Sequence, residues 1–193
     1  MKSARRSFFF PVAVFLAVVA ALAAGPSGGV MAKGDFAGSY AKFIHAARPV
    51  NAPDVPFFDA NGKKYTLTDF RGKVVLVNIW ATWCPACIVE MPQLDRLQAR
   101  LGGKDFMVLT LSQDGGGIPV VKRFLKKRNL ANLPIFIDRN RRLGKAFNQD
   151  LLPTTILLDA EGRERGRIIG PVEWDSPKTL AFIKRYLPDG PPS

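Results

Sequence analysis

The chain has 193 residues, which suits one export segment and one globular domain, and 47% of them are hydrophobic, enough to form a core without disulfide staples. The formal net charge of +12 fits a basic protein surface that faces solvent. It also fits a surface that binds an anionic membrane or an acidic partner. Because no basic motif is interleaved with aromatic residues, we do not expect nucleic acid as a partner. No internal repeat is present, which excludes repeat architectures.

The first 24 residues have the organisation of a targeting segment. Three basic residues within the first six precede an apolar run over residues 8–24, and Ala21-Leu22-Ala23 provides small residues for cleavage. We interpret residues 1–24 as a signal peptide or, if uncleaved, as an N-terminal membrane anchor. We therefore expect an exported domain, in the periplasm or on the periplasmic face of the inner membrane.

Residues 25–48 are interpreted as a linker and a short helix, ahead of the main domain at 49–190. The linker is rich in Gly, Ser and Ala, and the apolar residues between Asp35 and Ala47 recur at helical spacing. The only histidine of the chain, His45, falls in this stretch. We expect His45 on the surface, which disfavours Cys-His hydrolase chemistry.

Strands and helices alternate through the main domain. Asn61-Gly62 predicts a hairpin turn, and the nearly all-apolar run 74–80 predicts a strand buried on both faces. Further elements are expected as helix 84–101, strand 106–111, helix 118–128, strand 135–137, helix 142–147, the antiparallel strands 154–159 and 166–169, and a last helix that begins at Ser176. This order predicts an α/β sandwich with a mixed central sheet flanked by helices.

The chain has two cysteines, Cys84 and Cys87, and they lie between a predicted buried strand and a predicted helix. Backbone N–H groups at the start of a helix favour the thiolate of Cys84, which is the nucleophile in disulfide exchange. Cys87 lies one turn further on and can close a ring with Cys84, so that it resolves a mixed disulfide. The pair therefore predicts a redox-active disulfide with no other cofactor.

Other roles for the two cysteines are weaker. A structural disulfide between residues three apart closes too short a loop to stabilise the fold much. A structural zinc site needs about four ligands, and the chain offers two cysteines and one histidine, so we expect no such site. Capture of copper(I) by the two thiolates stays open as an alternative.

Two further positions support the site. Glu90 lies three residues after Cys87, on the same helical face; a buried carboxyl there would have a raised pKa and could exchange protons with the cysteines, whereas an exposed one would only complement the helix dipole. Leu152-Pro153 precedes a strand, where either a cis or a trans peptide bond is possible. We expect Leu152 and Pro153, with Trp83 and Pro85 beside Cys84, to contact substrate.

The segment Asn78–Cys87, with Glu90-Met91-Pro92, resembles the TlpA/ResA/CcmG group of thioredoxin-like proteins, as does the segment 153–159. The resemblance implies a thioredoxin-like fold with an N-terminal hairpin and a central strand–helix insertion. It also implies that Asn78 stands where cytosolic thioredoxins carry a buried Asp, and that Glu90 is the proton-handling glutamate. Thiol peroxidases of this fold carry Thr three residues before the reactive cysteine. This chain has Ala81 at that position, so we do not expect a peroxidase.

The same resemblance implies a reductase that acts on disulfides of exported proteins, in cytochrome c maturation or copper-site assembly. Its own cysteines would be re-reduced by a membrane electron carrier of the CcdA/DsbD type. The group usually has Pro before the second cysteine, whereas this chain has Ala86. Because the residues between the cysteines tune the potential, an oxidase or isomerase remains the alternative.

Overall fold

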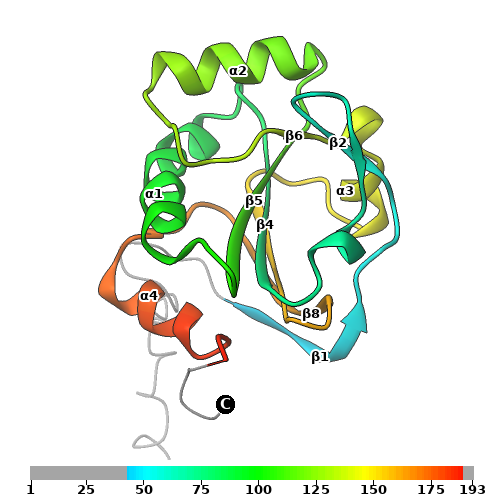
Figure 1. Ribbon diagram of the computed structural model, residues 1–193, viewed down its shortest axis with the longest axis vertical. Coiled ribbons are helices and arrows are strands. Elements are labelled where there is room, and N and C mark those ends of the chain that lie inside the picture. Colours follow the sequence, from blue (N-terminus) through cyan, green and yellow to red (C-terminus); the bar gives the residue numbers. More distant parts are fainter. Residues whose placement is uncertain (1–42, 189–193) are drawn as a thin grey trace, which may run out of the picture. The chain divides into compact units, whose positions relative to one another are not determined.

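The computed structural model describes residues 43–188, all within the second of the two units into which the chain divides, Lys33–Ser193 (Figure 1). The proposed export segment 1–24 lies outside the described residues, as does the linker 25–48 up to residue 42. In the described part of the chain, no helix combines the length and the apolar character needed to cross a bilayer.

The fold is built on one mixed eight-stranded sheet with the strand order β1-β8-β7-β4-β5-β6-β2-β3. The central strand β4 (Val74–Trp80) pairs in parallel with β5 (Phe106–Ser112) and antiparallel with β7 (Thr154–Leu158). β6 (Phe136–Ile137) pairs in parallel with β5, and β8 (Arg163–Ile169) pairs antiparallel with β7. The α/β class and the mixed sheet predicted from the sequence are confirmed.

The predicted hairpin is formed by β2 (Phe57–Asp59) and β3 (Lys64–Tyr65), with Gly62 at φ 81° in its turn. A left-handed φ of this kind favours glycine, which explains the Asn-Gly signal. The 3-10 turn η1 (Leu67–Phe70) follows the hairpin directly, with Thr66 as its N-cap.

The four α-helices of residues 43–188 lie close to where the apolar periodicity places them. α1 (Pro85–Leu101) follows β4, and α2 (Gly117–Lys127) follows β5. α3 (Arg142–Ala146) follows the 3-10 turn η2 (Arg139–Arg141), and α4 (Pro177–Lys184) closes the described chain. The side chain of Ser176 accepts a hydrogen bond from the backbone N–H of Thr179, as expected of a helix N-cap.

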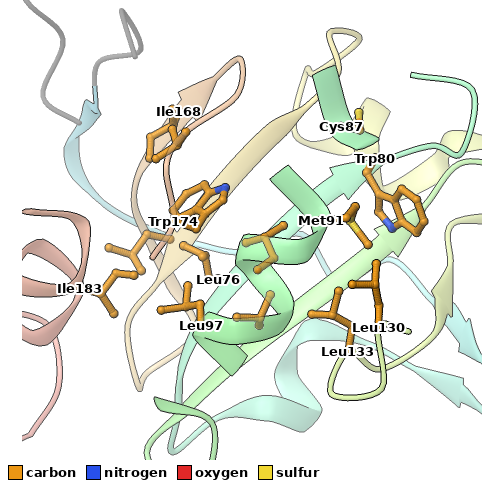
Figure 2. Packing of buried hydrophobic residues seen from close by; sticks show 14 of the residues in the cluster. Leu76, Trp80, Cys87, Met91, Leu97, Leu130, Leu133, Ile168, Trp174 and Ile183 are labelled. Atoms are coloured by element: carbon orange, nitrogen blue, oxygen red, sulfur yellow. The ribbon is translucent and has the colours of Figure 1, made fainter. Parts of the chain in front are cut away.

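Both faces of the sheet are covered by apolar side chains. Along β4 the side chains alternate, so that Leu76 and Trp80 join the cluster under α1, α2 and α4 while Val75 and Val77 join the cluster on the α3 side. Figure 2 shows the first cluster, with Cys87 at one end and Leu97 further along α1. A strand buried on both faces explains why β4 is almost entirely apolar.

The N-terminal edge of the sheet corrects one expectation. The residues predicted as the end of a short helix instead enter β1 (Ile44–Asn51), which pairs antiparallel with β8. Phe43, the residue before the strand, is 6% exposed and packs in the first cluster, while His45 is exposed as expected. The apolar residues recur at a spacing that a helix would satisfy, but pairing with the edge of β8 decides the conformation.

Candidate active site

The two cysteines occupy the start of α1, where β4 has just ended. Cys84 is the N-cap residue, and the backbone N–H of Cys87 donates to its sulfur across 3.1 Å. The two residues form a disulfide with a Cα–Cα distance of 5.3 Å. Cys84 is 5% exposed and Cys87 is fully buried, so an incoming substrate sulfur reaches Cys84 and not Cys87.

Glu90 lies one helical turn after Cys87 and is fully buried. Its carboxylate accepts hydrogen bonds from Asn78 Nδ2 at 2.7 Å, from Trp174 Nε1 at 2.9 Å and from the backbone N–H of Val172 at 3.4 Å. Desolvation by burial raises the pKa of Glu90 to about 7, although the three donors oppose the shift. Of the two interpretations of Glu90, the structure selects the buried carboxyl.

Asn78 links Glu90 to the neighbouring strand. Its side chain amide is buried at the centre of β4 and also donates to Thr155 Oγ1 on β7, across 2.9 Å. Its Oδ1 atom has no hydrogen-bond partner among the described residues. An amide at this position donates to a carboxylate and adds no charge, so Glu90 can hold a proton near neutral pH.

Two of the four proposed substrate-contacting residues, Trp83 and Pro85, flank Cys84 in the chain. Trp83 is 66% exposed, and Pro85 is exposed on the first turn of α1. The Leu152–Pro153 peptide bond is cis, and Leu152 packs against the cluster that contains both cysteines. The contacts of these four residues with substrate stay a prediction.

Polar bonds fix the turn that precedes Cys84. Asp114, at the end of β5, accepts from the backbone N–H of Thr82 at 3.0 Å and from its hydroxyl at 2.6 Å. Asp114 is itself held by Ser112 Oγ at 2.7 Å. The turn that carries Trp83 and Cys84 is thereby tied to the loop that begins α2.

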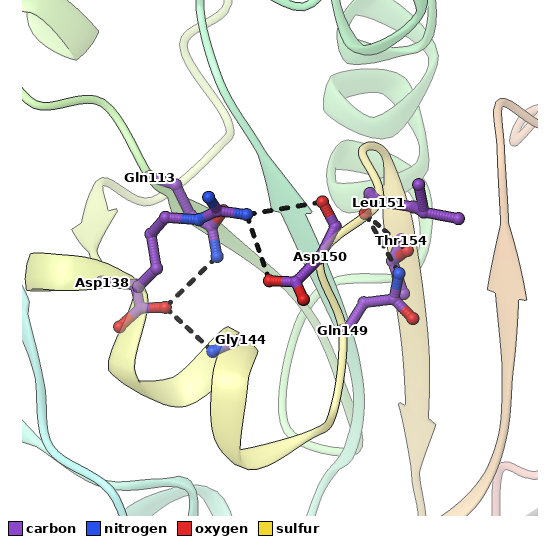
Figure 3. Close-up of polar contacts among 8 residues, drawn as sticks. Gln113, Asp138, Gly144, Gln149, Asp150, Leu151 and Thr154 are labelled. Atoms are coloured by element: carbon purple, nitrogen blue, oxygen red, sulfur yellow. Dashed lines mark hydrogen bonds and ion pairs between the residues drawn. The ribbon is translucent and has the colours of Figure 1, made fainter.

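A second group of polar contacts surrounds the segment that leads to Pro153. Asp138 accepts from Gln113 and from the backbone N–H of Gly144, while the carbonyl of Leu151 accepts from Thr154 Oγ1 at 2.8 Å and from Gln149 at 3.3 Å (Figure 3). These bonds fix the backbone immediately before the cis-proline.

Trp174 is a residue in contact with Glu90 that reasoning from the sequence missed. It lies between β8 and α4, and its backbone N–H donates to Gln93 of α1 at 2.9 Å while its indole donates to Glu90. The available signal was a tryptophan two residues before the helix N-cap Ser176, since a buried indole N–H needs an acceptor. Among residues 43–188, no group of three or more metal-ligating side chains is present.

The sequence of the chain is similar to those of known thiol-disulfide oxidoreductases. The Redoxin family model matches residues 48–183. The chain is 34% identical over 137 residues to the thiol-disulfide oxidoreductase ResA of Bacillus thuringiensis subsp. konkukian, covering 71% of this chain and 77% of that protein. ResA of Geobacillus thermodenitrificans is 35% identical over 136 residues, which cover 70% and 74% of the two chains.

Solved structures agree on the fold. The exposed lipoprotein thioredoxin Etrx1 of Streptococcus pneumoniae is 29% identical with a TM-score of 0.58, covering 69% of this chain and 99% of that one. A thioredoxin-family thiol:disulfide interchange protein of Chlorobium tepidum is 26% identical with a TM-score of 0.58, covering 72% and 99%. With a cysteine pair at the tip of α1 and a buried glutamate behind it, the chain belongs to the Redoxin family as a ResA-like thiol-disulfide oxidoreductase of thioredoxin fold.

Proposed function

We propose that this protein is an exported dithiol reductase that reduces disulfides of other exported proteins. In the reduced protein, the Cys84 thiolate attacks a substrate disulfide, forms a mixed disulfide and releases one substrate thiolate. Cys87 then attacks the Cys84 sulfur, which releases the second substrate thiolate and regenerates the Cys84–Cys87 disulfide. Two electrons pass from the dithiol to the substrate, and an external dithiol must return them.

The observation that carries this proposal is the buried carboxyl of Glu90 one turn behind Cys87. Cys87 has to lose its proton before it can attack, and water is excluded from its surroundings. With a pKa of about 7, Glu90 can accept that proton at neutral pH and release it again. Glu90 therefore acts as the proton acceptor that makes Cys87 a nucleophile.

The proposed location follows from the first residues of the chain. A basic N-terminus and an apolar run over residues 8–24 support export, with the run either cleaved or kept as an anchor. The similarity to an exposed lipoprotein of Streptococcus pneumoniae supports the same location. In the periplasm or on its membrane face, substrates would be the haem-binding cysteines of apocytochrome c or copper-site cysteines, and the electron donor a CcdA/DsbD-type membrane protein.

Insulin reduction tests the assignment of the two cysteines. We expect Cys84→Ser to abolish turnover and Cys87→Ser to accumulate mixed disulfides with substrate in the native host. Substrates trapped in this way, identified by mass spectrometry, would test the cytochrome and copper-site classes directly. Turnover retained by Cys84→Ser would refute the nucleophile assignment.

The reduction potential tests the direction of electron flow. Thioredoxin has a potential of about −270 mV and the oxidant DsbA about −120 mV. Equilibration of the Cys84–Cys87 pair with glutathione or dithiothreitol buffers should give a value nearer the first. A value near the second would assign this chain to disulfide formation.

A further inference from the structure

The positive charge of the domain is concentrated in one segment. Between residues 115 and 147 the sequence has nine Lys and Arg residues and one acidic residue, Asp138, which is buried. The rest of the described chain has fourteen basic and thirteen acidic residues, so this segment supplies nearly all of the net charge. All nine cations are exposed; they are Lys122, Arg123, Lys126, Lys127, Arg128, Arg139, Arg141, Arg142 and Lys145, and we call them the cationic surface.

The cationic surface is poorly neutralised by the protein itself. Among the described residues, the one ion pair that it forms joins Arg141 to Asp150 at 3.4 Å, and Asp150 is itself exposed. Arg128 and Arg139 lie over the rings of Phe124 and Phe58, which hold the cations in place without cancelling their charge. The field of these groups therefore extends into solvent.

The cationic surface also lies beside the active cysteines. α2 crosses the end of the sheet at which β4 ends and α1 begins (Figure 1). The ring of Phe124 on α2 is 5.2 Å from that of Trp80 at the end of β4, and Asp114 at the start of the α2 loop holds Thr82. At the other end of the cationic surface, Arg141 donates to Asp150. Asp150 is followed by exposed Leu151 and then by the Leu152–Pro153 segment.

A cleft opens within this surface. Its volume is about 610 Å³, and its lining includes Gln113, Ile118, Arg139 and Arg141. The two buried carboxylates that reach it, Asp114 and Asp138, already accept hydrogen bonds from within the protein. The cleft therefore offers a partner's acidic side chain the guanidinium of Arg139 and the N–H groups of Arg141 that Gln113 and Asp150 do not use.

We propose that the cationic surface binds acidic segments next to the disulfide of the substrate protein, and so selects acidic substrates. This inference rests on the proposed reductase function and names its substrate class. Charge complementarity would speed the encounter and orient the substrate disulfide towards Cys84. A lipid surface is a poorer occupant, because a membrane on this face would cover the active site.

Two disulfide-bridged peptides of equal length test the proposal, one with Asp and Glu around its cysteines and one with Ser and Asn. The reduced full-length protein is mixed with each peptide at low salt and at 0.5 M NaCl, and the rate constant of disulfide exchange is measured. The fourfold variant Lys122→Glu, Arg123→Glu, Lys126→Glu, Lys127→Glu replaces the positive charge of α2 with negative charge. The matched control Lys64→Glu, Arg100→Glu, Lys104→Glu, Lys184→Glu makes the same change of charge at exposed positions elsewhere.

We expect the wild type to reduce the acidic peptide at least about tenfold faster than the neutral one at low salt, with the preference lost at high salt. The α2 variant should lose the preference and keep its rate on the neutral peptide, whereas the control should keep both. Equal rates on the two peptides, or equal losses in both variants, would overturn the proposal. Failure to reduce either peptide would instead contradict the reductase function itself.

Sedimentation with anionic phospholipid vesicles tests whether the cationic surface binds a membrane instead. The wild type and the α2 variant are compared on the same vesicles in the same buffers. Vesicle binding that is lost in the α2 variant, together with no peptide preference, would assign the surface to a membrane and reject an acidic substrate.

Discussion

The indole nitrogen of Trp174 donates a hydrogen bond to Glu90 Oε2 across 2.9 Å, although the two residues are 84 positions apart in the chain. The bond joins the segment after β8 to the helix that carries both cysteines. Hydrogen bonds to the ionised form of a carboxyl lower its pKa. Trp174 is therefore a positioning residue that keeps the Glu90 proton exchangeable near neutral pH.

Replacement of Trp174 by Phe should move the pH dependence of disulfide exchange to higher pH. A hydrogen bond to a charged group contributes about 1.5–3 kcal/mol, so its loss should raise the Glu90 pKa by about one unit or more. The measurement is the rate of exchange with a neutral peptide disulfide between pH 5 and 9.

Trp80→Phe is the matched control for this experiment. Trp80 is also fully buried, but its indole nitrogen has no hydrogen-bond partner in the described part of the chain. We expect the pH profile of this variant to stay at its wild-type position. Equal shifts in the two variants would mean that the profile reports general loosening of the core and not the bond to Glu90.

Glu90→Gln should make the free energy of unfolding of the oxidised protein less dependent on pH. The folded-state pKa of about 7 lies above the ordinary value of 4.5, so the folded protein binds this proton more tightly than the unfolded chain does. The contribution of Glu90 to wild-type stability should therefore fall by about 3 kcal/mol as pH rises from about 4.5 to 7. The amide cannot ionise and escapes this loss.

Urea unfolding at pH 5 and pH 8, with the disulfide intact, measures the difference. We expect the free energy of unfolding of Glu90→Gln to gain on that of the wild type between the two pH values. Parallel behaviour of the two proteins would contradict a raised pKa for Glu90 in the folded protein.

Asn78→Asp should strengthen the same pH dependence. The substitution replaces an amide donor 2.7 Å from Glu90 with a second carboxyl, and two buried carboxyls at this distance cannot both ionise readily. Unfolding free energy should fall more steeply above pH 7 than in the wild type. Asn132→Asp is the control, because Asn132 also donates to a carboxylate, that of Asp95, but is exposed; its effect should stay below about 1 kcal/mol.

Gly166→Ala should loosen the edge strand β1. A Cβ at Gly166 would lie 2.5 Å from the carbonyl oxygen of Ile44 and 2.5 Å from the ring of Phe43, so backbone would have to move. Gly62→Ala is the control, since both glycines have a positive φ, 157° at Gly166 and 81° at Gly62, but no atom lies within 4 Å of a Cβ at Gly62. The control should lose about 1 kcal/mol by thermal or urea unfolding, and Gly166→Ala clearly more. Equal losses would mean that β1 adjusts freely.

Local patterns predicted most of the architecture because each element repeats a simple spacing. The all-apolar run of β4, the stripe on α1 and the Asn-Gly turn are properties of neighbouring residues. β1 escaped prediction because its conformation depends on β8, which lies more than 100 residues further along the chain. Short segments at a sheet edge are decided by their partner.

The candidate site also has one part that local sequence predicted and one part that it could not. Cys84, Cys87 and Glu90 share one helix, so their arrangement followed from helical spacing. The bonds of Glu90 to Asn78 and Trp174 depend on how β4 and the segment after β8 pack on α1, and no local pattern contains that information. The raised pKa of Glu90 was foreseen only on condition of burial, because periodicity alone does not distinguish a buried face from an exposed one.

The hydrogen bond from the Cys87 backbone to the Cys84 sulfur has a consequence for the reduced enzyme. Reduction leaves a negative charge on Cys84, and a charge formed at a buried atom normally requires neighbouring dipoles to reorient. Here the donor already points at the sulfur, at 3.1 Å, before any electron arrives. The first turn of α1 is thus preorganised for the thiolate, and electron transfer demands little rearrangement of the backbone.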